Sequence, residues 1–424
     1  MTERLLQFIW QFQYYNNGEL STVSGERVQI ISPGLINNNQ GPDFSNAKIK
    51  IAKTTWAGSI ELHIKTSDWN RHNHNGDKNY TNVVLHVVWE NDETNNDSRH
   101  AIPILELKDR VSKILLHRYD TLMNNASFIP CEKSIDTIRE LAWKSWKERL
   151  LAERLLRKSS VVEQFLRQSN YHWEESFWWM LARNFGIPVN GSAFEAIAKS
   201  ISITILAKHK NQVHQLEALL FGQAGLLDMN FTEDYPGLLQ KEYKFLRAKY
   251  TLSPIHHPVH FLRMRPGNFP TIRLAQLAAL LHESSHLFSK IKETESIKDV
   301  RKWFDLPAND YWHYHYRFDE LSPFRRKNIG ESMKDNIIIN TIVPVLFAYG
   351  NYNNEVKYKL KALQWLEETR TETNVITKGF NSIGIGSKSA YDSQSLIELK
   401  NEYCNKRKCL DCTVGNYLLR KRES

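Results

Sequence analysis

The fold of the N-terminal part is decided by one stretch, GPDFSNAKIKIAKTTWAGSIELHIKTSDW, residues 41–69. Its second half alternates apolar and polar residues, which is the pattern of a β-strand with one face in a core. Successive side chains of a strand point to opposite faces, so Glu61, His63 and Lys65 should share one face. The sequence therefore predicts a central strand that carries an acid, an imidazole and an amine side by side.

The rest of the chain divides by its periodicity. Up to about residue 110 an opening helix is followed by runs rich in β-branched residues, separated by Asn, Gly and Asp clusters that indicate turns. Beyond residue 111 apolar residues recur at helical spacing. We therefore predict an α+β protein with an α/β domain (residues 1–125), a large mostly α-helical domain (126–400) and a Cys-rich tail (401–424).

Composition narrows the classes of partner. The net charge of +9 favours an anionic partner such as nucleic acid, although charge by itself predicts only non-specific attraction. No run of eighteen apolar residues occurs, so no membrane partner is expected, and protein partners cannot be predicted. The opening residues predict a helix and not a signal peptide, and four cysteines are too few for a secreted disulfide framework. We therefore expect a cytoplasmic protein.

Two carboxylates come close together in this pattern. Asp43 stands at the entrance of the strand that precedes the Glu61 strand, so the two acids are predicted to meet on neighbouring strands. Carboxylate oxygens are the ligands that Mg²⁺ or Mn²⁺ prefers, and a bound cation can polarise a phosphodiester and activate water. His63 or Lys65 could then orient that water or stabilise charge on the phosphate.

This arrangement resembles the PD-(D/E)XK nuclease-like superfamily, whose core has the element order αβββαβ. Pro42-Asp43 and Glu61-Leu62 match the two parts of its motif. The resemblance implies that Asp43 and Glu61 bind the metal and that Asp43, Glu61, His63 and Lys65 are catalytic. The chain departs from the motif because His63 occupies the usual lysine position, with Lys65 as the nearest lysine on the same face.

Most of the chain also resembles an uncharacterised bacterial family, the domain of unknown function numbered 2851. The resemblance lies in GLINNNQGPDFSNAKIKI, GSIELHIKTSDWNRHNHNGDKNYTNVVLHVV, RMRPGNFPTIRLAQLAALLH and the terminal CLDCTVGN. It implies one fold over these segments and no particular mechanism.

A second set of possible ligands follows the Glu61 strand. His72 and His74 form a His-X-His pair in a predicted loop, and Asp77 and His86 come soon after. Together with His63 they could hold zinc and leave a position open for water. In the alternative interpretation, His72 and His74 line a polar cleft and bind substrate phosphate together with three neighbours, Asp68, Trp69 and Arg71.

A third candidate is the sequence His282-Glu283-Ser284-Ser285-His286, which matches the zinc-protease pattern H-E-x-x-H. On one continuous helix the two histidines would lie one turn apart on the same face. The same segment has a strong apolar stripe, so it is also explained as a packed helix. No third ligand follows in a recognisable setting.

The cysteines suggest a second metal. Cys404, Cys409 and Cys412 lie close together near the C-terminus, and Cys131 is the only other cysteine. Thiolates are good ligands for zinc and for iron–sulfur clusters, so the four residues could bind a structural Zn²⁺ or a cluster if the fold brings Cys131 near. Three unligated thiols in a tail are the alternative.

The sequence thus favours a metal-dependent nuclease that hydrolyses phosphodiester bonds of DNA or RNA. One alternative is a non-catalytic nucleic-acid-binding or scaffold protein that retains the fold. The other is a zinc hydrolase that uses either the HExxH segment or the HxH loop.

Overall fold

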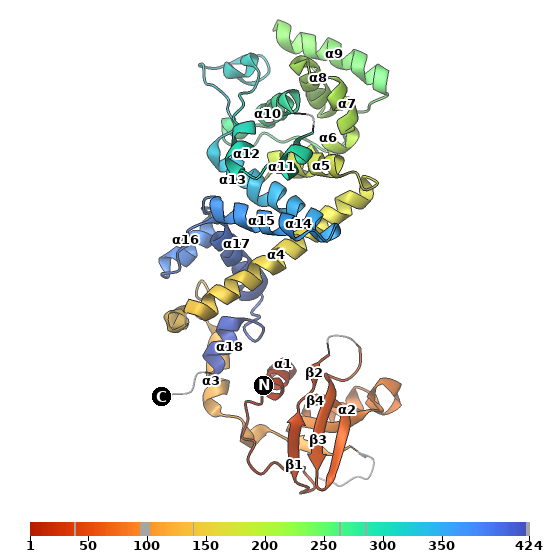
Figure 1. Cartoon of the computed structure of the whole chain (residues 1–424), viewed down its shortest axis with the longest axis vertical. Coiled ribbons are helices and arrows are strands. Elements are labelled where there is room, and N and C mark those ends of the chain that lie inside the picture. Colours follow the sequence, from red (N-terminus) through yellow and green to blue (C-terminus); the bar gives the residue numbers. More distant parts are fainter. Residues whose placement is uncertain (38–39, 94–101, 139, 263, 285, 421–424) are drawn as a thin grey trace. The chain divides into compact units, whose positions relative to one another are not determined.

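The structure is a computed structural model that describes residues 1–37, 40–93, 102–138, 140–262, 264–284 and 286–420 (Figure 1). The chain forms two compact units. Unit 1 combines Met1–Lys144 with Lys400–Ser424, and unit 2 is Ser145–Leu399. The segment predicted as a separate tail therefore belongs to the same unit as the N-terminal sheet.

Unit 1 is built on a six-stranded mixed sheet with the order β1-β3-β4-β5-β6, in which β2 also pairs with β3. The β1/β3, β2/β3 and β3/β4 pairs are antiparallel, whereas β4/β5 and β5/β6 are parallel. The stretch up to about residue 110 that was predicted to contain strands thus forms this sheet. The strands are β1 (Val28–Ser32), β2 (Leu35–Ile36), β3 (Phe44–Ile51), β4 (Thr54–Lys65), β5 (Val83–Glu90) and β6 (Ile104–Glu106).

The helices of unit 1 begin with α1, which packs against β4 (Figure 1). The Thr2 side chain accepts a hydrogen bond from the Leu5 N–H and so caps α1, whose apolar residues are buried. The helices are α1 (Glu3–Gln11), α2 (Asp68–Arg71), α3 (Lys113–Asn124) and α18 (Thr413–Arg420).

Strand β4 is the centre of the sheet, and its segment from Ile60 to His63 is buried on both faces. Ile60 and Leu62 fill the apolar side, while Glu61 and His63 on the other side are only 6% and 1% exposed. Because β4 and β5 are parallel, the chain must cross from the end of one to the start of the other. This crossover, residues 66–82, packs on the polar side of β4 and covers the side chains of Glu61 and His63.

In its described residues, unit 2 consists of helices and one small hairpin, so the α+β class is confirmed. The first of these helices, α4, begins at Glu140, which belongs to unit 1. A π-helical turn, Ile338–Ile342, joins α13 to α14. No helix among the described residues has both the length and the apolarity needed to cross a membrane. The elements are α4 (Glu140–Gln168), α5 (Trp173–Gly186), α6 (Gly191–Ser200), α7 (Ile203–Lys208), α8 (Val213–Gln223), α9 (Asp234–Tyr250), α10 (Pro270–Glu283), α11 (Leu287–Glu293), α12 (Ile297–Trp303), β7 (His315–Arg317), β8 (Glu320–Leu321), α13 (Glu331–Ile337), α14 (Val343–Tyr352), α15 (Val356–Glu368), α16 (Val375–Ser382) and α17 (Ala390–Glu398).

Glu217 of α8 is a fully buried carboxylate of unit 2. It accepts hydrogen bonds from the Tyr235 hydroxyl (2.7 Å) and from Trp312 Nε1 (3.1 Å). Burial disfavours the charged form and raises the pKa of Glu217 to about 7, although both hydrogen bonds oppose the shift.

The raised pKa of Glu217 predicts a pH-dependent stability. Between pH 4.5 and about 7 the folded chain holds a proton that the unfolded chain has lost, so the free energy of unfolding should fall as pH rises. The expected contribution is roughly 1.4 kcal/mol per pH unit in this window. Glu217→Gln should remove this slope in urea unfolding between pH 4.5 and 8. The exposed Glu367→Gln is the control, and equal slopes for wild type and Glu217→Gln would contradict the prediction.

Candidate metal centre

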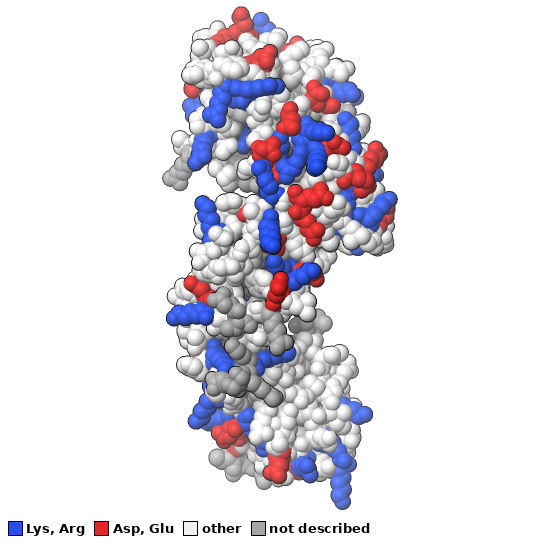
Figure 2. All heavy atoms as spheres, turned by 60° about the vertical axis from the view of Figure 1, so that its left-hand side comes forward, with Lys and Arg blue, Asp and Glu red and all other residues white. Residues whose placement is uncertain are grey.

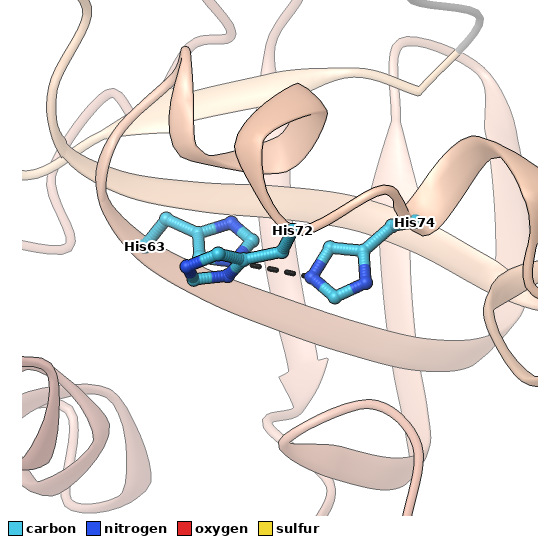
Figure 3. A group of neighbouring side chains, drawn as sticks. All are labelled: His63, His72 and His74. Atoms are coloured by element: carbon cyan, nitrogen blue, oxygen red, sulfur yellow. Dashed lines mark hydrogen bonds between the residues drawn. The ribbon is translucent and has the colours of Figure 1, made fainter.

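Four side chains converge on the polar side of β4. Glu61 and His63 come from the strand, and His72 and His74 come from the crossover that covers it. The imidazoles of the three histidines point toward one another (Figure 3), and their ligand atoms all lie within 4.8 Å of each other. The sequence analysis grouped His63 with His72 and His74 as possible zinc ligands. Glu61, which it assigned to a separate site with Asp43, lies beside His63 and His74 in the structure.

The spacing of these atoms suits one metal ion. His63 Nε2 lies 3.1 Å from His72 Nδ1, 3.4 Å from His74 Nε2 and 3.5 Å from Glu61 Oε1. His74 Nε2 lies 3.5 Å from the same Glu61 oxygen. Ligand atoms held tetrahedrally around zinc at about 2.0–2.1 Å are about 3.3–3.4 Å apart, so these four distances are close to a tetrahedral edge. Glu61 is close to His63 and His74, whereas the group whose ligand atoms all lie within 4.8 Å of one another consists of the three histidines.

A further histidine supports the site from behind. His86 of β5 is buried beside β4, and its Nε2 lies 2.9 Å from His63 Nδ1. If His63 Nε2 binds a metal, its Nδ1 carries the proton and donates a hydrogen bond to His86 Nε2. Such an outer hydrogen bond fixes the ring orientation and the tautomer of a metal ligand.

The two predicted acids are neighbours. Glu61 Oε2 accepts a hydrogen bond from the backbone N–H of Asp43 (3.0 Å), which leaves Oε1 facing the histidines. The Asp43 carboxylate accepts hydrogen bonds from the Leu62 N–H (3.0 Å) and from Gln7 Nε2 (2.8 Å). Asp43 therefore anchors β3 to β4 and to α1, and both of its oxygens already have partners within the protein.

Burial controls the charge of the site. It raises the pKa of Asp43 to about 6 and, with the nearby charge of Asp43, that of Glu61 to about 8. Burial together with His72 and His74 lowers the pKa of His63 to about 3, and the pKa of His74 is lowered by burial and by His72. His63 and His74 are thus held neutral, which is the form that coordinates a metal.

Aromatic rings form the inner wall. The Tyr80 ring stacks on His74 with centroids 3.9 Å apart, and Trp69 meets the same imidazole edge-on at 5.2 Å. Trp69 is 2% exposed and donates its indole N–H to Asn75 Oδ1 (2.8 Å). Its ring therefore has no surface on which a nucleotide base could stack, and its position is that of a wall.

The other predicted residues lie around the site. The buried Asp68 accepts a hydrogen bond from the Lys65 N–H (3.1 Å) and pairs with Arg71 (2.8 Å). Arg71 and Lys65 have exposed side chains, and Lys65 Nζ is 3.9 Å from Asp92. Asp77 accepts a hydrogen bond from the Asn79 N–H and so stabilises the loop.

The HExxH segment does not form the helix that its pattern predicts. Helix α10 ends at Glu283, and α11 begins after His286, so the two histidines do not share one continuous helix. His282 Nδ1 donates a hydrogen bond to the Lys210 backbone carbonyl, and His286 is exposed. The physical cause is a half-buried acid of α5: Glu174 accepts hydrogen bonds from the N–H groups of Phe288 and Ser289 and so caps a new helix start.

Two residues of the site escaped the sequence analysis. Gln7, which binds Asp43, belongs to α1, and its position as a polar residue within a strongly apolar helix is the signal that could have identified it. Tyr80 carries no such signal because its stacking on His74 depends on the conformation of the crossover.

Comparison with known proteins gives one family. Its model, described as a protein of unknown function (DUF2851), matches residues 3–375. No curated protein and no solved structure matches the chain significantly.

Proposed function

We propose that this chain, which belongs to the DUF2851 family of proteins of unknown function, is a metal-dependent hydrolase of phosphodiester bonds in nucleic acid. The observation that carries the proposal is the convergence of ring nitrogens of His63, His72 and His74, with Glu61 Oε1 3.5 Å from His63 Nε2 and from His74 Nε2. A nuclease-like core and a cytoplasmic location are parts of the same proposal.

The donor set favours Zn²⁺ or Mn²⁺ over Mg²⁺. Three imidazoles and one carboxylate are typical of transition-metal sites, whereas Mg²⁺ prefers oxygen ligands and keeps several waters. Asp43, the other acid in a Mg²⁺ site of the kind first predicted, has both carboxylate oxygens engaged with Leu62 and Gln7. In this proposal Asp43 is a positioning residue that holds Glu61 in place.

A metal held here would act as a Lewis acid and lower the pKa of an attacking water. The chain's own groups supply the rest. His86 orients His63, the Asp43 N–H orients Glu61, and Trp69 and Tyr80 exclude water from the inner side. His72 is the exposed ligand, so substrate would approach from its side.

The choice of a phosphodiester rests on the surroundings of this open side. Arg71 precedes His72 directly, and Lys65 and Lys78 are exposed on the strand end and on the crossover. Lysine and arginine side chains bind phosphate and position the backbone of a nucleic acid. Elsewhere, basic and acidic side chains are interspersed on the face shown in Figure 2, so contacts near the metal are expected to matter more than a broad basic surface.

The element order also supports a nuclease-like core. Helix α1, strands β1, β3 and β4, the short helix α2 and strand β5 follow the order αβββαβ, with β4 and β5 parallel. Strands β2 and β6 are additions to that order, and the crossover helix α2 has a single turn.

The test is cleavage of labelled single- and double-stranded DNA and RNA by metal-free protein supplied with Zn²⁺, Mn²⁺ or Mg²⁺. We expect cleavage with Zn²⁺ or Mn²⁺, and a loss of at least about 100-fold in Glu61→Gln because the charged ligand is removed. Glu106→Gln is the matched control, since Glu106 is a carboxylate of β6 in the same sheet.

Two results would contradict the proposal. Cleavage that survives unchanged in Glu61→Gln would place the activity elsewhere in the preparation. Stoichiometric metal binding without cleavage of any of these substrates would exclude the nuclease and favour the non-catalytic alternative.

A further inference from the structure

The four cysteines all belong to unit 1, where Cys404, Cys409 and Cys412 are buried and Cys131 is partly buried. Among the described residues, the group of ligand atoms close enough together to hold one metal ion consists of the three histidines and includes no cysteine. A thiolate metal centre therefore stays a prediction from the sequence.

Unit 2 has a pocket of about 430 Å³ that lies outside the histidine site. Residues of α4, α5 and α6 line it, together with Asn340 of the π-helical turn, and all of them belong to unit 2. Pockets for small organic ligands typically enclose roughly 300–1,000 Å³. The space is therefore large enough for a ligand of that kind.

Part of the lining is apolar. Phe165 of α4 and Met180 of α5 are buried, and Val161 and Ile187 add exposed apolar side chains to the same pocket. Covering such surface stabilises the apolar part of an organic ligand in proportion to the area that is removed from water. An inorganic ion would gain nothing from these four side chains.

The charged side chains of the lining are mostly basic. They are Lys158 of α4, Arg183 of α5, and Glu195 and Lys199 of α6. Glu195 pairs through Oε1 with Lys199 Nζ (2.7 Å) and through Oε2 with Arg183, so both of its oxygens are engaged. Because three cations accompany a single acid, the lining has an excess of two positive charges.

One of these cations has no partner among the described residues. Lys158 is half-buried, yet it forms no hydrogen bond or ion pair with any residue that the structure describes. Its neighbours on α4, Arg154 and Arg157, both pair with Glu398 of α17. An ammonium group that is partly withdrawn from water without a counter-ion is unfavourable. An anion in the pocket would supply the missing partner.

The lining also contains an unsatisfied acceptor. Asn184 is 3% exposed and donates through Nδ2 to Thr341 Oγ1 (2.9 Å), but its Oδ1 has no hydrogen-bond partner in the described part of the chain. Thr341 belongs to the π-helical turn, an element that is frequent at functional sites. A buried oxygen without a donor costs free energy, so a hydroxyl or N–H group of a ligand would be stabilising here.

We propose that this pocket of unit 2 is a binding site for a small organic phosphate monoester, whose phosphate group is held by Lys158 and Arg183. The organic part of the ligand lies against Phe165 and Met180, and a hydroxyl or N–H group of the ligand donates to Asn184 Oδ1. The site uses no residue of unit 1 and is therefore independent of the proposed hydrolysis.

The charge of the lining selects this class of anion. A phosphate monoester carries a charge of about −1.5 to −2 at neutral pH, which matches the excess of two positive charges. A monocarboxylate would neutralise only one of them, and an uncharged molecule would leave Lys158 without a partner. Arg183 donates to Glu195 through Nη1, and the guanidinium group has further N–H donors for phosphate.

The first test measures occupancy of the pocket at Lys158 in the full-length protein. Burial and the nearby Arg154 and Arg157 lower the pKa of Lys158 to about 8, so near neutral pH an acylating reagent should label it readily. Labelling is measured by mass spectrometry with a panel of nucleoside monophosphates, sugar phosphates and phosphorylated cofactors, and with inorganic phosphate, succinate and the unphosphorylated parent compounds. We expect an ester at about ten times its Kd to protect Lys158 about tenfold, and to leave the exposed Lys241 of α9 unprotected.

The second test is calorimetry with the most protective ester. Lys158→Met should weaken its binding at least about tenfold, because a charged hydrogen-bond donor is lost, whereas Lys241→Met should not. The Lys158→Met protein should fold, since Lys158 bonds to no other residue that the structure describes. The proposal is overturned if no ester protects Lys158, if inorganic phosphate or succinate protects it as well as the best ester at the same concentration, or if Lys158→Met binds that ester as tightly as the wild type.

Discussion

Replacing His72 and His74 with alanine is expected to lower the affinity of the histidine site for Zn²⁺ by at least about 100-fold and to abolish hydrolysis. The two substitutions remove two of three imidazole ligands and leave Glu61 with His63 alone. A mononuclear zinc site needs three or four protein ligands, so the remaining pair should bind weakly.

The fold should survive this change. His72 is exposed and His74 lies on the crossover, so neither is part of the apolar side of β4. The main loss is the stacking of Tyr80 on His74, which should cost about 1 kcal/mol. Circular dichroism and the unfolding temperature should therefore stay close to those of the wild type.

Zinc affinity is measured by competition with a coloured chelator, with Cys131, Cys404, Cys409 and Cys412 replaced by serine in every protein compared. The control is His117→Ala, because His117 is an exposed histidine of α3 in the same unit. An affinity equal to that of the control would show that the histidines do not bind the metal. If the variant folds and no longer binds zinc but still cleaves nucleic acid at the wild-type rate, the histidine site is not the catalytic site.

The sheet could be predicted because its strands alternate with a period of two, and β4 shows how far this reasoning extends. Alternation placed Glu61 and His63 on one face, which is confirmed. Alternation could not indicate that this face is also buried. That burial results from the parallel pairing of β4 with β5, which sends the crossover back over the polar side.

The candidate site was only half predictable for the same reason. Each pair of ligands has a local pattern, Glu-X-His on the strand and His-X-His in the loop. The sequence analysis therefore grouped His63 with His72, His74 and His86 as possible ligands. The position of Glu61 beside them could not be predicted, since it depends on the path of residues 66–82 over β4. The sequence analysis assigned Glu61 to a Mg²⁺ or Mn²⁺ site with Asp43, whereas its free oxygen faces the histidines.

The HExxH segment shows the opposite error, in which a local pattern predicts a continuous helix that the structure does not contain. Apolar spacing predicts one helix through His282 and His286, but the Ser284-Ser285 pair has low helix propensity. Glu174 of α5 then decides the outcome by capping α11 from outside the segment. A partner more than a hundred residues away cannot be found from periodicity.

Replacing Trp312 with alanine is expected to lower the free energy of unfolding by about 4–5 kcal/mol. The indole is fully buried and packs against Phe221 and Phe318, each with ring centroids 5.1 Å away. Deleting a buried tryptophan costs about 3–5 kcal/mol through lost contacts and the cavity left behind. The buried Glu217 also loses the indole N–H that it accepts, which adds to the loss.

Trp312→Phe separates these two causes. It keeps most of the ring volume but removes the N–H donor, so it should cost only about 1–3 kcal/mol, chiefly from Glu217. Phe245→Ala, at an exposed aromatic residue of α9, should change stability by at most about 0.5 kcal/mol. Urea unfolding of the three variants measures all three values. If Trp312→Phe lowers the free energy of unfolding as much as Trp312→Ala does, the buried hydrogen bond dominates over the ring packing. If Trp312→Ala lowers it no more than Phe245→Ala does, the core around Trp312 is not formed.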